Sequence, residues 1–572
     1  MLNFKKKKMK INKYLCLILG ISALTGCGDI DNNLEGQVLA ETFFTSEESV
    51  QTAVNGVFGN MHNRFFLSRE TGLTLMLRSD MVEISDPNTR SERIDHNNLN
   101  DLADNRNNEE TWPQMYKIVS SANVAITGAQ DLEETNSLNR LIAQARFGRA
   151  FAYFHLVRQY GAIPMPPEAV TDVVSASAIS RTPVAEVYES IIEDLEFAKL
   201  WLSDIEVNRS IPAKSTASAY LALVHLTMGS FQEAYDESTE LIGNESLYQL
   251  GLEPDFQRLF DSATALGSNE PLFLLDFIGN GILGDDSTDY LVPLTGIRDD
   301  DQFNTPEQDN QEGWAVTVPS LRVYETWDDQ DYRKLVSFNS SAIFGIDNPD
   351  FDDSLPVSDD NPENLEIVVN YTDGPTDSRI ALEQAIAAEN GTTFVLEDVP
   401  RAFADDLNGG DTRNVNQPYG AKYTRFRGVA EGNGRASSQK YMLMRYAEVL
   451  LIAAESAIEI GNEAEALTYI NRVRARARAG GNTVILREDI AVPASPEPAD
   501  LTSVTVADVL EERRLELAFE LKRWYDIVRR EMGPEVFGES GLEGFKENFN
   551  EAEDYLLAIP ASEVAKNPAL GQ

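Results

Sequence analysis

The chain has 572 residues, with 93 Asp and Glu against 48 Lys and Arg, which gives a formal net charge of −45 at pH 7. This excess of acid repels nucleic acids and anionic membrane surfaces, so nucleic acid is excluded as a partner. With 42% hydrophobic residues the chain can bury a large core, and its length exceeds that of a usual single-core domain. We therefore expect one large composite fold or several domains.

The start of the chain has the three parts of a secretory signal. A lysine-rich segment precedes an apolar run from Tyr14, and the run ends at the sequence LTGC, whose last residue is Cys27. This ending resembles the bacterial lipobox, where the chain is cut before the cysteine and the cysteine is lipidated; an ordinary signal with a chance cysteine is the alternative. The other cysteine, Cys16, leaves with the signal. We predict a signal peptide at 1–26 and a lipidated tether at 27–45 that anchors the protein to a membrane.

Most of the following chain has helical periodicity. Ser46 is a good N-cap for a first helix, and apolar residues then advance by three or four positions in several segments, which puts them on one helical face. We predict further helices at roughly 110–129, 139–160, 181–204, 214–229, 231–243, 440–460, 462–479 and 505–530.

Two pairs of these helices share a glycine turn. One pair breaks at Gly229 and the other at Gly461, and an alanine follows early in each second helix. This is the layout of tetratricopeptide repeats, whose paired helices bury their apolar faces by stacking on neighbouring pairs. The sequence therefore predicts a mainly α fold, a tetratricopeptide-like helical-repeat superhelix.

Residues 245–438 differ because they are rich in Asp, Asn, Gly and Pro, with short apolar runs such as PLFLLDFI at 271–278 that suit strands or buried loop anchors. Long loops on a rigid scaffold are where binding residues usually lie. We therefore divide a single domain over 46–572 into a helical part (46–244), a loop-rich ligand-binding part (245–438) and a C-terminal helical part (439–572).

Motifs for enzymes and metal sites are weak. Gly279 to Gly284 match G-x-G-x-x-G, but the acidic sequence that follows does not favour the helix that would hold a pyrophosphate. The four histidines (His62, His96, His155 and His225) form no closely spaced pair, and no G-x-S-x-G sequence occurs. The Asp-rich segments lack the EF-hand pattern, so solvated loops are favoured over a structural calcium site. We expect no catalytic residue, no metal site and no other cofactor. A two-carboxylate glycosidase is the less favoured alternative.

Seven segments carry motifs in the order of one known family: TWPQMYKIVSSANVAI (111–126), QARFGRAFAYFHLVRQYGAIPMP (144–166), RTPVAEVYESIIEDLEFA (181–198), MLMRYAEVLLIAAESA (442–457), INRVRARA (470–477), EERRLELAFELKRWYDIVR (511–529) and YLLAIPASEVAKNP (555–568). With the lipobox, they resemble the SusD/RagB outer-membrane lipoproteins of Bacteroidetes over essentially the whole chain. The resemblance implies four tetratricopeptide-like helix pairs and an irregular, loop-rich half.

The resemblance also implies a function. Such proteins are lipid-anchored in the outer membrane, face the cell exterior and form a lid on a SusC-like TonB-dependent transporter. They capture oligosaccharides for import, without catalysis, and some members capture peptides instead. The sequence leaves open which glycan or peptide is bound.

The candidate ligand contacts follow from the chemistry of sugars, which need flat aromatic faces surrounded by polar groups. Trp314 is the preferred residue because it lies in the loop-rich half. Tyr290 and Phe303 flank the same region, and Arg78 and Asp80, after the first helix, could bond hydroxyl groups.

The other tryptophans are expected to be structural. Trp112 and Trp524 lie within helix motifs, Trp201 ends a helix, and Trp327 belongs to a segment that resembles a structural part of the family. In the C-terminal motif we expect salt bridges at helical spacing. The charged side chains that could form them are Arg513, Arg514, Glu516 and Glu520.

Overall fold

The computed structural model describes residues 43–85, 89–166, 177–277, 289–296, 314, 316–339, 341–346, 365–370, 394–398, 419–420, 422–423, 437–485, 488–538, 546 and 548–571. The signal peptide with Cys27, the G-x-G-x-x-G sequence, Phe303 and most of the Asp-rich segments lie outside these residues. From Ser46 onward the chain forms one compact unit.

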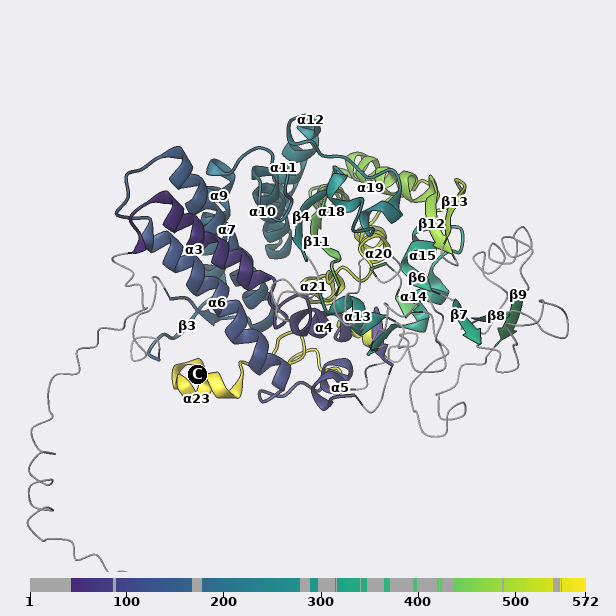
Figure 1. The fold of residues 1–572 in the computed structure, drawn as a ribbon, viewed down its shortest axis with the longest axis horizontal. Helices are drawn as coiled ribbons and strands as arrows, with labels where there is room; N and C mark the ends of the chain where they lie inside the picture. The colour runs from purple at the N-terminus through teal and green to yellow at the C-terminus, as the bar shows by residue number, and fades with distance from the viewer. Residues whose placement is uncertain are drawn as a thin grey trace, which may run out of the picture. The chain divides into compact units, whose positions relative to one another are not determined.

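Long helices form the scaffold of this unit (Figure 1). They are α3 (Glu47–Met61), α6 (Arg106–Gly128), α7 (Asn136–Tyr160), α9 (Val184–Trp201), α10 (Lys214–Met228), α11 (Phe231–Gly243), α18 (Tyr446–Glu459) and α19 (Glu463–Arg478). Helices that follow one another pack together, α6 on α7, α10 on α11 and α18 on α19, and α11 packs on α18 across the sequence. The prediction of a mainly helical, tetratricopeptide-like fold is confirmed.

The two glycine turns have the backbone that the repeat layout requires. Gly229 and Gly461 have φ angles of 77° and 82°, in the left-handed region where glycine avoids the steric cost of a side chain. Each turn therefore reverses the chain within two or three residues, so that the second helix of the pair can pack on the first.

Short strands and helices connect the scaffold. The paired strands are β1 (Val82–Ile84) with β5 (Thr317–Pro319), β2 (Ile163–Pro164) with β3 (Arg181–Thr182), β6 (Phe338–Asn339) with β10 (Tyr419–Gly420), and β12 (Gly481–Ile485) with β13 (Glu488–Val492), all antiparallel. A three-stranded sheet contains β7 (Ser341–Ile346), β8 (Leu365–Asn370) and β9 (Phe394–Asp398). The short helices include α4 (Glu70–Leu77), α5 (Ser91–Asn98), α12 (Glu245–Tyr248), α13 (Leu291–Thr295), α14 (Leu321–Thr326), α15 (Tyr332–Ser337), α22 (Gly533–Phe537) and α23 (Ala561–Lys566).

The helix predicted over 440–460 is wrong in its first six residues. These form strand β11 (Lys440–Arg445), which pairs antiparallel with β4 (Pro271–Asp276), and α18 begins only at Tyr446. All six residues of β11 are buried, and a short, fully buried apolar run has no periodicity that separates strand from helix. Of the two alternatives for the apolar run at 271–278, the structure shows the strand, β4, over its first six residues.

The helix predicted over 505–530 is broken into α20 (Val506–Glu516) and α21 (Arg523–Arg529). Phe519 and Leu521 in the break have φ angles of 63° and 62°, which no helix contains. Apolar spacing continues across the break, so the sequence pattern alone could not locate it.

The salt bridges expected at helical spacing in this segment are also wrong in their partners. Arg513 pairs with Asp526 at 3.0 Å, and Arg514 pairs with Glu511. Glu516 instead contacts the buried Arg445 and Arg476. The Arg514–Glu511 pair is local to α20, whereas Arg513 and Glu516 bind partners outside that helix.

A buried ion cluster surrounds Glu516 and joins three parts of the chain. Its carboxylate contacts the guanidinium groups of Arg333, Arg445 and Arg476, and Arg445 and Arg476 also bind Glu270 at 2.7 and 2.9 Å. Each of these side chains is nearly inaccessible to solvent. The cluster thus holds the loop-rich part, strand β11 and helix α19 against the end of α20.

The tryptophans expected to be structural are in or against the core. Trp112, Trp327 and Trp524 are each 2% exposed, and Trp201 is partly buried at the end of α9. His155 is also buried, and its Nδ1 is 2.8 Å from the Tyr525 hydroxyl. The interpretation of these side chains as scaffold residues is confirmed.

Candidate ligand-binding site

Trp314 and Tyr290 are brought together by the backbone around α13. The Tyr290 amide donates to the Ser68 carbonyl at 3.1 Å, and the Trp314 amide donates to the Pro293 carbonyl at 2.5 Å. Val316 then donates to Leu294 at 2.8 Å, which continues the chain toward β5. Two residues that are distant in sequence are therefore fixed on either side of one short helix.

The two rings form a parallel stack, which we call the aromatic pair. Their centroids are 6.0 Å apart and their planes differ by 9°. Tyr290 is buried at 7% exposure, whereas Trp314 is only partly buried against the core. The buried ring therefore supports a more open one, an arrangement that can offer an aromatic face to a ligand.

Arg69 is a third member of this site, and it was missed by the sequence analysis. It lies just before α4, and its guanidinium carbon is 5.4 Å from the centroid of Tyr290 and 6.0 Å from that of Trp314. The contact comes from tertiary packing across more than 200 residues. No local motif marks Arg69, so the sequence carried no signal that could have found it.

Asp289 holds the start of α13. Its Oδ1 accepts a hydrogen bond from the Leu291 amide at 2.9 Å, and its own amide donates to the Ser437 carbonyl. The side chain is fully buried, and its Oδ2 has no hydrogen-bond partner among the described residues. Burial raises the pKa of Asp289 to about 7, against the opposing effect of the Leu291 and Val292 amides. The residue next to Tyr290 thus titrates near neutral pH.

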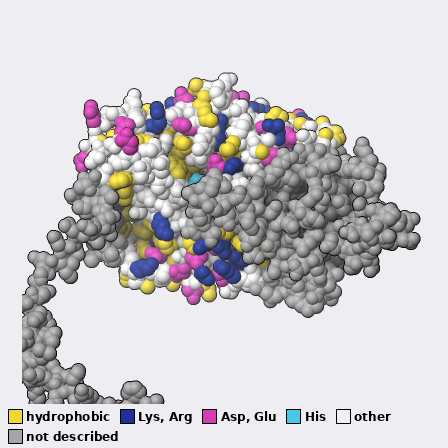
Figure 2. All heavy atoms as spheres, viewed as in Figure 1, with side chains coloured by type: hydrophobic (Ala, Val, Ile, Leu, Met, Phe, Trp, Pro, Cys, Tyr) yellow, Lys and Arg dark blue, Asp and Glu magenta, His cyan; other side chains and the backbone are white. Residues whose placement is uncertain are grey.

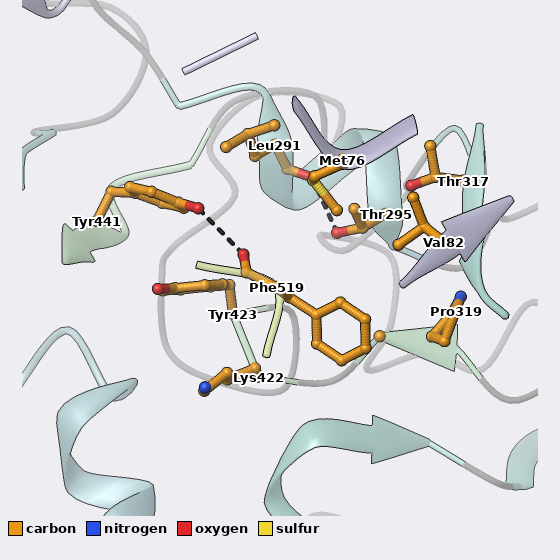
Figure 3. Close-up of a pocket in the computed structure, with 11 residues that line it drawn as sticks. Met76, Val82, Leu291, Thr295, Thr317, Pro319, Lys422, Tyr423, Tyr441 and Phe519 are labelled. Atoms are coloured by element: carbon orange, nitrogen blue, oxygen red, sulfur yellow. Dashed lines mark hydrogen bonds between the residues drawn. The ribbon is translucent and has the colours of Figure 1, made fainter. Parts of the chain in front are cut away.

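A small apolar hollow, partly open to solvent, is lined in part by Leu291 and Thr295 of α13 (Figure 3). Its lining residues are Met76, Val82, Leu291, Thr295, Thr317, Pro319, Gly420, Lys422, Tyr423, Tyr441 and Phe519. The Tyr441 hydroxyl donates to the Phe519 carbonyl at 3.1 Å, and the Lys422 amine is occupied by carbonyl and carboxylate oxygens. The lining is mainly apolar, and its Lys422 and Tyr441 side chains are bonded within the protein.

Arg78 and Asp80 have partners within the protein. Arg78 is 1% exposed, contacts Asp101 and lies 4.5 Å from the ring centroid of Trp524. Asp80 accepts two hydrogen bonds of 2.8 Å from Arg523. These contacts fasten the end of α4 to the C-terminal part, so we assign both side chains a structural role and leave them out of the proposed site.

Metal and membrane features are absent from the part of the chain that the structure describes. Among those residues, no group of three or more His, Cys, Asp or Glu side chains could hold a metal ion. No described helix combines the length and the apolar character needed to cross a bilayer.

Comparison with known proteins gives matches over the whole chain. Residues 285–572 match the SusD family, and residues 31–226 match a family described as "Starch-binding associating with outer membrane". The SusD-like protein P2 of Formosa agariphila is 40% identical over 571 residues, which are 99% of this chain and 98% of that protein.

Solved structures share the fold at lower identity. A laminarin-binding SusD-like protein has a TM-score of 0.67 at 20% identity, covering 91% of this chain and 98% of its own. A SusD homologue from Bacteroides thetaiotaomicron has a TM-score of 0.69 at 18% identity, covering 94% and 98%. Sequence and fold agree with the resemblance of the motifs. The chain therefore belongs to the SusD family of outer-membrane-associated, non-catalytic glycan-binding proteins.

Proposed function

We propose that this protein captures oligosaccharides at the outer face of the outer membrane and delivers them to a SusC-like TonB-dependent transporter. The observation that carries the proposal is the aromatic pair, whose partly exposed Trp314 is supported by the buried Tyr290. The laminarin-binding protein of the same fold and the family described as starch-binding also favour a glycan over a peptide.

The physical argument concerns the faces of a pyranose ring. Its C–H groups form an apolar face that can cover an indole ring, while its hydroxyl groups stay at the edge and need hydrogen bonds. Arg69 lies beside both aromatic rings and supplies donors at that edge. Such a site binds a sugar through noncovalent contacts alone and leaves it chemically unchanged, as capture before transport requires.

Substitution of Trp314 tests the proposed contact. We expect Trp314→Ala to weaken binding of the oligosaccharide by about 1–3 kcal/mol, or about 5- to 150-fold, with little change in thermal unfolding. The matched control is Trp327→Ala, because Trp327 also lies in the loop-rich part but is buried. This variant should lose about 3–5 kcal/mol of unfolding free energy. Calorimetric titration against oligosaccharides and peptides, together with melting curves, measures both effects. Wild-type affinity in Trp314→Ala would move the site elsewhere, and tight binding of peptides alone would favour the peptide-capturing alternative.

The membrane anchor is proposed to be lipid on Cys27, which lies outside the described residues. Cys27→Ser should abolish labelling with palmitate and release the protein from membranes, because a polar tether alone gives no apolar surface for insertion. Fractionation of cells that express either form measures this. Continued membrane association with unchanged labelling would locate the anchor at another residue.

A further inference from the structure

The charged side chains around Arg69 indicate whether the bound glycan is neutral or anionic. Arg69 pairs with Glu70 at 3.2 Å, and its side chain is 14% exposed. Arg90 and Arg93, at the start of α5, act electrostatically on the same carboxylate. We call Arg69, Arg90 and Arg93 the arginine group. Figure 2 shows Lys and Arg side chains together with Asp and Glu side chains on the part of the surface where Figure 1 draws α5.

The members of the arginine group repel one another. Burial lowers the pKa of Arg93, the Glu70 carboxylate raises it, and both Arg90 and Arg69 lower it again. Like charges that are close together in a partly buried site raise the free energy of the folded state unless a negative group compensates them.

Two carboxylates lie against the arginine group. Glu70 is 1% exposed, and burial raises its pKa although Arg69 and Arg93 oppose that shift. Glu92 is 3.7 Å from Arg90. Among the described side chains, Glu70 and Glu92 act on these arginines, and the nearby Arg106–Glu110 pair adds one charge of each sign. Asp95 and Asp104 are further carboxylates near Glu92.

Arg69 connects this positive charge to the aromatic pair. Its guanidinium lies about as far from Trp314 as the Tyr290 ring does, so a group at the edge of a sugar on Trp314 would be within its reach. A neutral hydroxyl can be bound by uncharged amides, whereas a guanidinium matches the two oxygens of a carboxylate or a sulfate.

We infer that the ligand is an anionic glycan, whose carboxylate or sulfate group is bound by Arg69 while its sugar ring lies on Trp314. This inference rests on the proposed function and names the substrate class of the same site. Arg90, with 43% of its side chain exposed, and Arg93 add favourable potential around the bound group.

The test compares uronic-acid-containing, sulfated and neutral oligosaccharides by calorimetric titration against the full chain. An acidic oligosaccharide should bind most tightly, and its affinity should fall as sodium chloride rises, because salt screens the arginine group. Uronic-acid-containing and sulfated oligosaccharides are titrated separately, so the ligand with the higher affinity identifies the anionic group that the site binds. Arg69→Gln should weaken the acidic ligand roughly 10-fold or more and a neutral one much less.

Two further variants keep the test decisive. Arg90→Gln changes an exposed side chain, so it should fold normally and still weaken the acidic ligand in low salt. Arg258→Gln removes an exposed arginine that pairs with Glu253 elsewhere, and it should bind like the wild type. Tightest binding of a neutral glycan that depends on Trp314, or acidic binding unaffected by Arg69→Gln and Arg90→Gln, would overturn the inference and leave the proposed function intact. Binding of no oligosaccharide would overturn both.

Discussion

The ion cluster around Glu516 and the arginine group around Glu70 use the same residue types in opposite ways. In the first, Arg445 and Arg476 each contact two or more buried carboxylates, so the buried charges are paired with one another in the core. In the second, Arg69 pairs with Glu70 and lies beside an aromatic ring that is only partly buried. Closed charge networks hold a structure together, whereas an open one is available to a ligand.

The largest effect is expected from breaking the closed network. Burial alone would raise the pKa of Glu516, but Arg476, Arg445 and Arg333 hold it well below its usual range. Glu516→Gln leaves those three guanidinium groups buried and without their shared charge, so it should cost about 3–5 kcal/mol of unfolding free energy. Urea unfolding measures the loss, and Glu551→Gln, at an exposed position, is the control. A loss below about 1 kcal/mol would mean that the network contributes little to stability.

A smaller, pH-dependent effect is expected at Asp289. Its pKa is raised to about 7 in the folded protein by burial, from an ordinary value of 3.8. The folded state therefore holds the proton more tightly than the unfolded state. The resulting stabilisation is complete below about pH 4 and is lost as pH rises to about 7, by about 4 kcal/mol at most.

Asp289→Asn should remove this dependence, because an amide does not titrate. The measurement is the difference in unfolding free energy between the wild type and Asp289→Asn from pH 4 to pH 8, with Asp131→Asn at an exposed position as the control. A difference that stays constant with pH would contradict a raised pKa at this position. Since Asp289 holds α13 next to Tyr290, oligosaccharide affinity should be followed over the same range.

The helical scaffold was largely predictable from the sequence, whereas the candidate ligand-binding site was predictable only in part. Gly229 and Gly461 marked helix pairs because a left-handed turn is a local property of the chain. Trp314 could be proposed because it lies outside the helix motifs, but its stacking on Tyr290 depends on the backbone contacts of α13. Arg69 could not be selected from 48 basic residues, since its position beside the rings is set by tertiary packing.

The break between α20 and α21 was hidden for a related reason. Leu517 and Leu521 continue the apolar spacing, although Phe519 and Leu521 leave the helical backbone. What stabilises the break is the burial of Glu516 and Glu520 against cations from distant parts of the chain. A pattern of apolar residues contains no information about such partners.

The smallest effect is expected at Asp80, where a substitution distinguishes a structural salt bridge from a ligand contact. The Arg523 guanidinium lies 2.8 Å from each carboxylate oxygen, so Asp80→Asn keeps the shape but loses the charge and one acceptor. We expect a loss of about 1–3 kcal/mol in unfolding free energy and no change in oligosaccharide affinity. Melting curves and calorimetric titration on the same preparation measure both quantities, and Asp131→Asn again serves as the exposed control. Lost affinity with wild-type melting would instead make Asp80 a ligand contact, and the open site would then extend from the aromatic pair to the end of α4.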